Sequence, residues 1–97
     1  MHTVWGYDGS YTGTWTNVPF SGNHYKIVLS NGTCPNPPTD CSAGIYIKGP
    51  GNVQYAYLSA GGNSSNTLYT VIPAANCTIE MSRNDAGSVT GAQAIDL

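Results

Sequence analysis

Charged residues are scarce in this sequence. Asp, Glu, Lys and Arg together make up 8% of the chain, against about a quarter in an average soluble protein. The basic residues are Lys26, Lys48 and Arg83, and tight binding to a phosphate backbone needs several clustered cations. We therefore expect no nucleic-acid partner. No apolar run approaches the roughly 20 residues that a membrane helix needs, so we also expect no membrane span.

Large aliphatic residues are few as well, because Val, Ile, Leu and Phe total 17 of 97 residues. Seven Tyr and two Trp supply the missing apolar area, since each aromatic ring can bury about 150–250 Å². A chain of this length has room for one thin core, which predicts a single domain over residues 1–97. The rings exceed what such a core needs, and this surplus favours an aromatic binding surface.

Helical periodicity is almost absent, whereas an alternation of apolar and polar residues recurs along the chain. Tyr25, Ile27 and Leu29, for example, share one face of a strand. The expected strands cover residues 4–7, 11–15, 24–30, 43–48, 53–59, 67–72, 76–82 and 88–95, with a loop over 60–66. Seven to eight short strands at this spacing predict an all-β fold. We expect a small antiparallel β-sandwich of the jelly-roll or immunoglobulin-like kind, with a small β-barrel as the alternative.

The cysteines predict one disulfide. Cys34 and Cys41 bracket a segment with three prolines and no strand character, and a bridge closing so small a loop contributes about 2–3 kcal/mol. Cys77 is then left over and buried, because it alternates with Ile79 and Met81. Pairing of Cys77 with one of the other two stays open. Three thiols without a CxxC pair or a nearby His do not form a zinc site, so we expect no metal here.

The expected location is extracellular. Glycosylation acceptor patterns begin at Asn31, Asn63 and Asn76. Together with the low charge and the expected disulfide, they favour a secreted protein. The first residues lack the basic and apolar regions of a signal peptide, so we interpret the sequence as a mature domain.

The segment 83–87, together with Gly91, resembles the calcium-loop ends of some bacterial β-sandwich lectins, which also place Asn-Asp and glycines before a last strand. That resemblance implies a calcium site. Calcium takes six to eight oxygen ligands, however, and this segment offers the carboxylate of Asp85 alone. We therefore predict a turn, with neither a metal ion nor a cofactor.

Catalytic motifs are missing. The sequence contains no GxSxG elbow, no HExxH pair and no Walker glycine loop. His24, Glu80 and Arg83 are of the types that perform acid–base chemistry, but exposed strand residues paired with their neighbours are the simpler interpretation. We therefore predict a protein without catalytic activity.

Aromatic residues concentrate near the start of the chain, interleaved with Gly, Ser and Thr. Sugar rings present apolar C–H faces, on which an aromatic ring stacks while polar side chains bond the hydroxyls. The predicted ligand-binding residues are Trp5, Tyr7, Asp8, Tyr11 and Trp15. The leading hypothesis is therefore a non-catalytic carbohydrate-binding module or lectin that binds a polysaccharide or other glycan.

Two other functions stay open. Low charge gives little protection against the pairing of sheet edges, so the chain could be a self-assembling structural subunit of a fibre, pilus or coat, a homo-oligomer in which the terminal strands complete a neighbour's sheet. Alternatively, the chain is a secreted effector or enzyme inhibitor that docks through the rigid Cys34–Cys41 loop.

Overall fold

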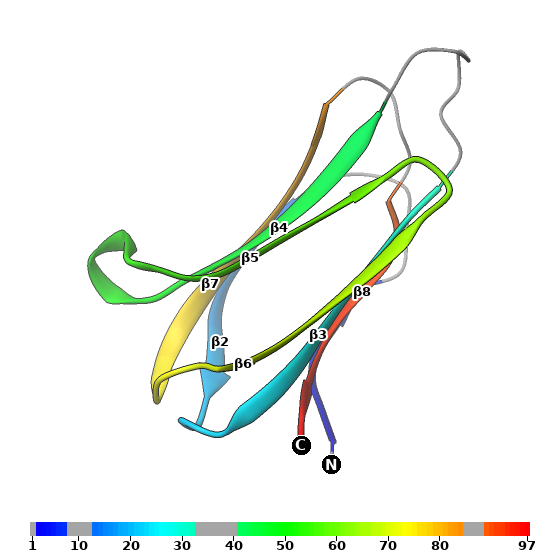
Figure 1. Ribbon diagram of the computed structural model, residues 1–97. Helices are drawn as coiled ribbons and strands as arrows, with labels where there is room; N and C mark the ends of the chain where they lie inside the picture. The colour runs from blue at the N-terminus through cyan, green and yellow to red at the C-terminus, as the bar shows by residue number, and fades with distance from the viewer. Residues whose placement is uncertain (1, 8–12, 33–40, 85–88) are drawn as a thin grey trace.

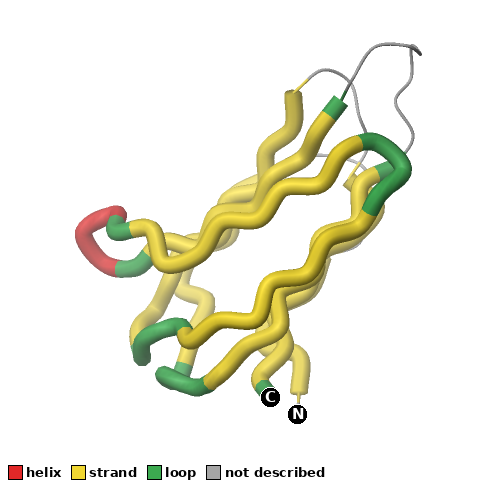
Figure 2. The backbone as a smooth tube through the Cα atoms, viewed as in Figure 1, coloured by secondary structure: helices red, strands yellow, loops and turns green. Residues whose placement is uncertain are grey.

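The protein is a two-layered sandwich of antiparallel strands (Figure 1). The computed structural model describes residues 2–7, 13–32, 41–84 and 89–97. The strands are β1 (His2–Tyr7), β2 (Gly13–Phe20), β3 (His24–Asn31), β4 (Ser42–Lys48), β5 (Gln54–Gly61), β6 (Ser65–Val71), β7 (Ala75–Asn84) and β8 (Val89–Asp96). A single 3-10 turn, η1 (Pro50–Asn52), joins β4 to β5 (Figure 2). Within the described residues, no helix is long and apolar enough to cross a membrane.

The order of the strands is that of a jelly roll. Sheet A contains the strands in the order β1-β8-β3-β6, and sheet B contains β2-β7-β4-β5. The pairs β1–β8, β2–β7, β3–β6 and β4–β5 are all antiparallel. The first four strands therefore run alongside the last four in reverse order, which gives two interlocked Greek keys. The prediction of a small antiparallel β-sandwich is confirmed.

The core lies between the sheets and is built by the alternation that the sequence shows. In β3 the side chains of Tyr25, Ile27 and Leu29 point inward and are at most 1% exposed. Alanine fills many of the facing positions: the buried alanines are Ala43, Ala56, Ala60, Ala92 and Ala94. Small residues let the two sheets approach closely, so the few large side chains are enough to fill the space between them.

The connection between β5 and β6 is much shorter than the expected loop over 60–66. Only residues 62–64 lie between the two strands. The turn is closed by Ser64, whose backbone N–H and Oγ both donate to the carbonyl of Gly61, at 3.3 and 2.7 Å. Asn63 adopts a φ of 56°, a left-handed conformation that Asn tolerates better than most residues. Most of the polar run over 60–66 therefore belongs to the two strands and not to a loop.

The described residues include two of the three cysteines. Cys41 is buried immediately before β4, and Cys77 is buried in β7 with a free thiol. The prediction that Cys77 is buried is confirmed, and its pairing with another cysteine is excluded. Cys34 lies outside the described residues, so the Cys34–Cys41 disulfide stays a prediction.

The burial of Cys77 has a measurable consequence. Its surroundings raise the pKa of the thiol by desolvation, so the thiol ionises more readily in the unfolded chain, where the pKa is about 8.5. The stabilising contribution is complete below that pH and is lost as the pH rises toward the folded-state pKa. We expect the free energy of unfolding to decrease above about pH 8.5, as urea titrations between pH 7 and 9.5 would measure.

The Cys77→Ala variant is the control for this expectation. It should lose some stability at every pH because a buried sulfur is removed, but the decrease above pH 8.5 should become shallower. An unchanged pH dependence in Cys77→Ala would show that other groups cause the decrease.

Candidate functional site

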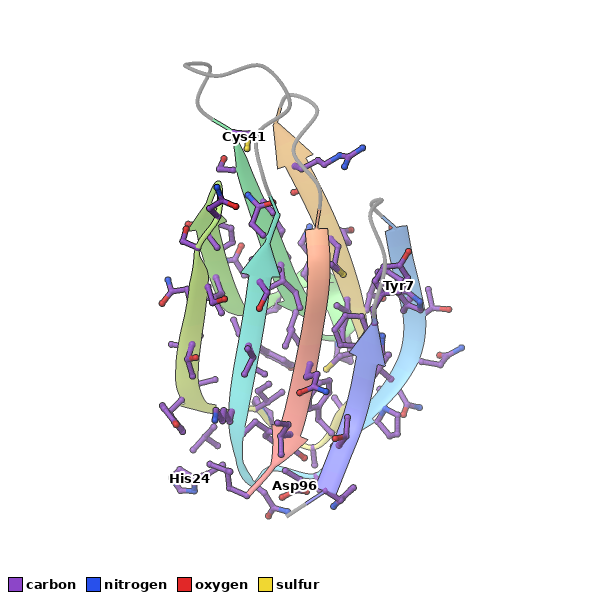
Figure 3. The ribbon with its side chains drawn as sticks, turned by 90° about the vertical axis from the view of Figure 1, so that its right-hand side faces the viewer. Tyr7, His24, Cys41 and Asp96 are labelled. Atoms are coloured by element: carbon purple, nitrogen blue, oxygen red, sulfur yellow. The ribbon has the colours of Figure 1, made fainter. Side chains whose placement is uncertain are left out.

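Three of the predicted ligand-binding residues come together at the seam between β1 and β2. Trp5 and Trp15 contact each other edge to face, with ring centroids 5.2 Å apart. Tyr7 lies 4.7 Å from Trp15, and Figure 3 shows Tyr7 beside the two strands. Each residue pairs with an inward-facing neighbour: Trp5 with Ala94, Tyr7 with Ala92, and Trp15 with Ile79. All three rings therefore point into the space between the sheets.

The seam cluster is mainly structural. Trp5 is only 8% exposed, so its ring face is not open to a sugar, and the expectation that Trp5 lies at the surface is wrong. Its Nε1 is buried without a hydrogen-bond partner among the described residues. Tyr7 and Trp15 are half-buried and pack against the core. The remaining predicted residues, Asp8 and Tyr11, lie outside the described residues.

A second pair of aromatic residues lies on the outer face of sheet B. Tyr46 in β4 is directly opposite Tyr57 in β5, and the two rings lie 4.6 Å apart at 42°. Tyr57 is 44% exposed, and its neighbours Ala56 and Leu58 point into the core. We call these two rings the tyrosine platform. Both tyrosines lie within the expected strands 43–48 and 53–59, but neither is among the ligand-binding residues predicted from the sequence.

An ion pair borders the tyrosine platform. The Lys48 Nζ donates to Glu80 Oε2 at 3.0 Å and lies 5.4 Å from the ring centroid of Tyr46. Glu80 is directly opposite Tyr46 on the neighbouring strand β7. This ion pair is partly buried and fixes a donor and an acceptor beside the aromatic rings.

Small residues form the surface next to the platform. Gly44 in β4 lies between Ser82 of β7 and Ser59 of β5 in the sheet register. The ring of Tyr57 leans over Gly44, where an added Cβ would come within 3.3 Å of its Cε1. Gly44 is therefore buried beneath the Tyr57 ring, and the exposed Ser59 and Ser82 form the polar surface beside the platform.

The outer face of sheet A has a different character. Its most exposed aromatic residue is Tyr69, at 65%, and its exposed aliphatic residues are Val71 and Leu97. Tyr69 is opposite Lys26 of β3, and no ring pairing involving Tyr69 is observed among the described residues. This face has one isolated ring, whereas sheet B has two in contact.

The residues considered for acid–base chemistry are not assembled. His24 precedes the inward-facing Tyr25 and is exposed on the outer side of sheet A, near one end of the molecule (Figure 3). Glu80 alternates with the buried Ile79, so it lies on the outer face of sheet B, and Arg83 follows it on the same strand. His24 and Glu80 therefore face solvent on opposite sides of the sandwich.

Metal-ligating side chains do not gather in the part of the chain that the structure describes: it contains no group of three or more His, Cys, Asp or Glu that could hold a metal ion. Asp85, the carboxylate considered for calcium, lies outside the described residues.

No protein-family model and no curated protein matches this chain. A function for the protein must therefore be argued from its own residues.

Proposed function

We propose that this protein is a non-catalytic carbohydrate-binding module or lectin, and that its ligand lies across the tyrosine platform of sheet B. The contact between the half-buried Tyr46 and the exposed Tyr57, with Lys48 and Glu80 beside it, is the observation that supports this function most. Aromatic rings offer stacking area to the apolar faces of sugars, and an open sheet face admits an extended polysaccharide chain.

The ion pair supports the same proposal. The Lys48 ammonium has three N–H donors, of which Glu80 takes one, and Glu80 keeps an oxygen that can accept a hydrogen bond from a sugar hydroxyl. Because Lys48 is held by both Glu80 and the ring of Tyr46, little side-chain freedom is lost on binding. A sugar stacked on Tyr57 would meet donors and acceptors that are already in place.

The charges on this face favour binding over hydrolysis. Glycosidases use two carboxyl groups about 5–9.5 Å apart, on either side of the scissile bond. The carboxylates in the described part of the chain are Glu80 and Asp96. Asp96 is buried in sheet A, where it accepts hydrogen bonds from Asn23 at 3.2 and 3.4 Å. Glu80 on sheet B therefore has no second carboxylate beside it among the described residues.

The proposed location is extracellular, as the low charge, the exposed acceptor residues Asn63 and Asn76 and the expected Cys34–Cys41 disulfide indicate. The third acceptor pattern adds no support, because Asn31 is buried. The alternative function, an effector or inhibitor, depends on the loop 34–40, which lies outside the described residues. No contact among the described residues favours it over glycan binding.

Replacing Tyr57 tests the platform. We expect Tyr57→Ala to weaken binding to the polysaccharide that binds the wild type by about tenfold or more. One aromatic contact contributes about 0.5–1.5 kcal/mol beyond the area it buries, and a loss of about 1.4 kcal/mol corresponds to a factor of ten in affinity. Tyr57→Phe keeps the ring and should bind within about threefold of the wild type. The measurement is depletion of micromolar protein by cellulose, chitin, β-1,3-glucan and xylan, followed by calorimetry with matching soluble oligosaccharides.

Tyr69→Ala is the matched control, since Tyr69 is an exposed strand tyrosine on the opposite sheet. Its affinity for the same polysaccharide should equal that of the wild type. Equal losses in Tyr57→Ala and Tyr69→Ala would move the site away from sheet B. Failure of the wild type to bind any plant, fungal or bacterial polysaccharide would overturn the proposed function.

A further inference from the structure

The two open sides of the sandwich differ in how their edge strands are protected. On one side, β1 has a register shift between Thr3 and Trp5, and β2 has one between Trp15 and Val18. On the other side, β6 pairs with β3 through seven consecutive residues without a shift. β6 also contains no proline and no charged residue. Bulges, prolines and charges normally prevent sheet edges from pairing with another chain, and β6 has none of these.

The hydrogen bonds at the ends of β6 show which of its backbone groups are unpaired in the sheet. Ile72 donates its N–H to Asn23 O, and Asn31 donates its N–H to Ser64 O. Even-numbered residues of β6 therefore point their backbone groups toward β3. Since backbone direction alternates along an antiparallel strand, the N–H and C=O groups of the odd-numbered residues point toward the open edge.

One half of this edge is already covered by a side chain. The Asn66 Oδ1 accepts from the N–H of Thr67 at 2.9 Å, and the Asn66 Nδ2 donates to Ser59 O of β5 at 3.0 Å. In the other half, the backbone N–H and C=O of Tyr69 and the N–H of Val71 have no such cover among the described residues. The carbonyl of Val71 receives only a long contact from Thr70 Oγ1, at 3.5 Å.

The uncovered half of the edge is also its most apolar part. Tyr69 is 65% exposed and Val71 is 48% exposed. If two copies of β6 run antiparallel with the two Thr70 residues opposite each other, Tyr69 of one copy pairs with Val71 of the other. Each such pair exchanges two backbone hydrogen bonds and places an aromatic ring beside a β-branched side chain.

We propose that the segment Tyr69–Val71 of β6 is a self-association edge, through which a second copy of this chain extends sheet A. The occupant is a second copy because the segment is self-complementary under two-fold symmetry and carries no charge that would repel its own image. The contact is short compared with the roughly 800 Å² per partner of a standard interface. The dimer is therefore weak, with a Kd of the order of 0.1–1 mM.

This edge differs from the one considered from the sequence. In the self-assembly alternative, the terminal strands complete a neighbour's sheet, but β8 is an interior strand between β1 and β3, and β1 is bulged. The association proposed for β6 does not depend on glycan binding, because Tyr46 and Tyr57 lie on the other sheet.

Sedimentation velocity between 0.02 and 2 mM protein tests the proposal, with the full chain and no ligand. The wild type should pass from monomer to dimer over this range. Val71→Lys should raise the Kd at least tenfold, because each copy then carries a positive charge at the two-fold contact and the two charges repel each other. Thr67→Lys, on the same face of the same strand but in the half that Asn66 covers, should change the Kd less than twofold. Amide exchange in the wild type gives a second measurement, in which protection of Tyr69 and Val71 increases with concentration.

A wild-type monomer at 2 mM would overturn the proposal, as would equal weakening by the two lysine variants. If Val71→Lys fails to fold, Val71→Pro takes its place, because it removes only an N–H that points away from β3. Amide protection that increases along β1 or β2 and not along β6 would assign the dimer to the other side of the sandwich.

Discussion

Replacing Tyr25 with alanine should lower the free energy of unfolding by about 3–5 kcal/mol, the usual cost of removing a large buried aromatic side chain. Tyr25 is fully buried and contacts Phe20 edge to face at 5.0 Å. Its hydroxyl oxygen accepts the backbone N–H of Ser21 at 2.8 Å, in the connection between the two sheets. Because single domains have a total stability of about 5–15 kcal/mol, urea titration should show a large shift of the midpoint.

Tyr25→Phe separates the two contributions of this side chain. It keeps the ring and removes the hydroxyl, so we expect a loss of about 0.5–1.5 kcal/mol. If Tyr25→Phe were as damaging as Tyr25→Ala, the hydrogen bond to Ser21 and not the packing against Phe20 would hold β2 and β3 together.

The second large effect is expected for Asn31→Asp. Asn31 ends β3 in sheet A and is 5% exposed, and its Nδ2 donates to Ala60 O of β5 in sheet B at 3.1 Å. Its Oδ1 has no hydrogen-bond partner among the described residues. A carboxylate at this position would be buried beside the Ala60 carbonyl without a donor. The expected loss at neutral pH is about 3–5 kcal/mol, the cost of an uncompensated buried charge.

The pH dependence identifies the cause of this loss. Burial raises the pKa of the introduced carboxyl group, so the penalty is absent below its unfolded pKa of about 3.9 and grows as the pH rises through the folded pKa. Relative to the wild type, the variant should therefore recover most of its stability near pH 4, where the protonated acid can donate to Ala60 O. Urea titrations of both proteins at pH 4 and pH 7 measure the difference.

Two variants control for the substitution itself. Asn76→Asp makes the same exchange at an exposed position of β7 and should change stability by less than about 0.5 kcal/mol. Asn31→Ala removes the hydrogen bond without adding a charge, and its loss of about 1–3 kcal/mol should be the same at both pH values. A pH-independent loss in Asn31→Asp would contradict the buried-charge explanation.

The sandwich could be predicted from the sequence because the alternation in its central strands is clear. The inward face of β3 follows from the alternating apolar residues Tyr25, Ile27 and Leu29, and that of β7 from the alternation that includes Cys77. The strand ends were harder to predict. β2 continues to Phe20 through Asn17, which has a φ of 58°, and Pro19. Both residues normally indicate a turn. Proline, which lacks a backbone N–H, is nevertheless tolerated in an edge strand such as β2, where an N–H that faces the open side makes no sheet hydrogen bond.

The aromatic cluster at the seam was predicted, but its role was not. Alternation shows that Trp5 and Tyr7 share one face of β1, yet it does not show which face is buried. The residues that alternate with them, Val4 and Gly6, are no more polar. Only the packing of β1 against β2 across the seam decides the question, and that contact joins separate sheets.

The tyrosine platform depends on a register that the sequence does not reveal. A two-residue turn centred on Pro50 and Gly51 would pair Tyr46 with Tyr55. In the structure β5 begins at Gln54, and the register shifts between Ile47 and Lys48, so that Tyr46 is opposite Tyr57. A shift of two residues keeps the same face outward but changes which rings meet.

The pairing of β1 with β8 has a practical consequence for any measurement on a surface. His2 lies opposite Asp96, and the two chain ends leave the sandwich at the same corner (Figure 1). A tag, resin or carrier joined through either end would be anchored at that single corner. Immobilised molecules would then present a uniform orientation, whichever end carries the attachment.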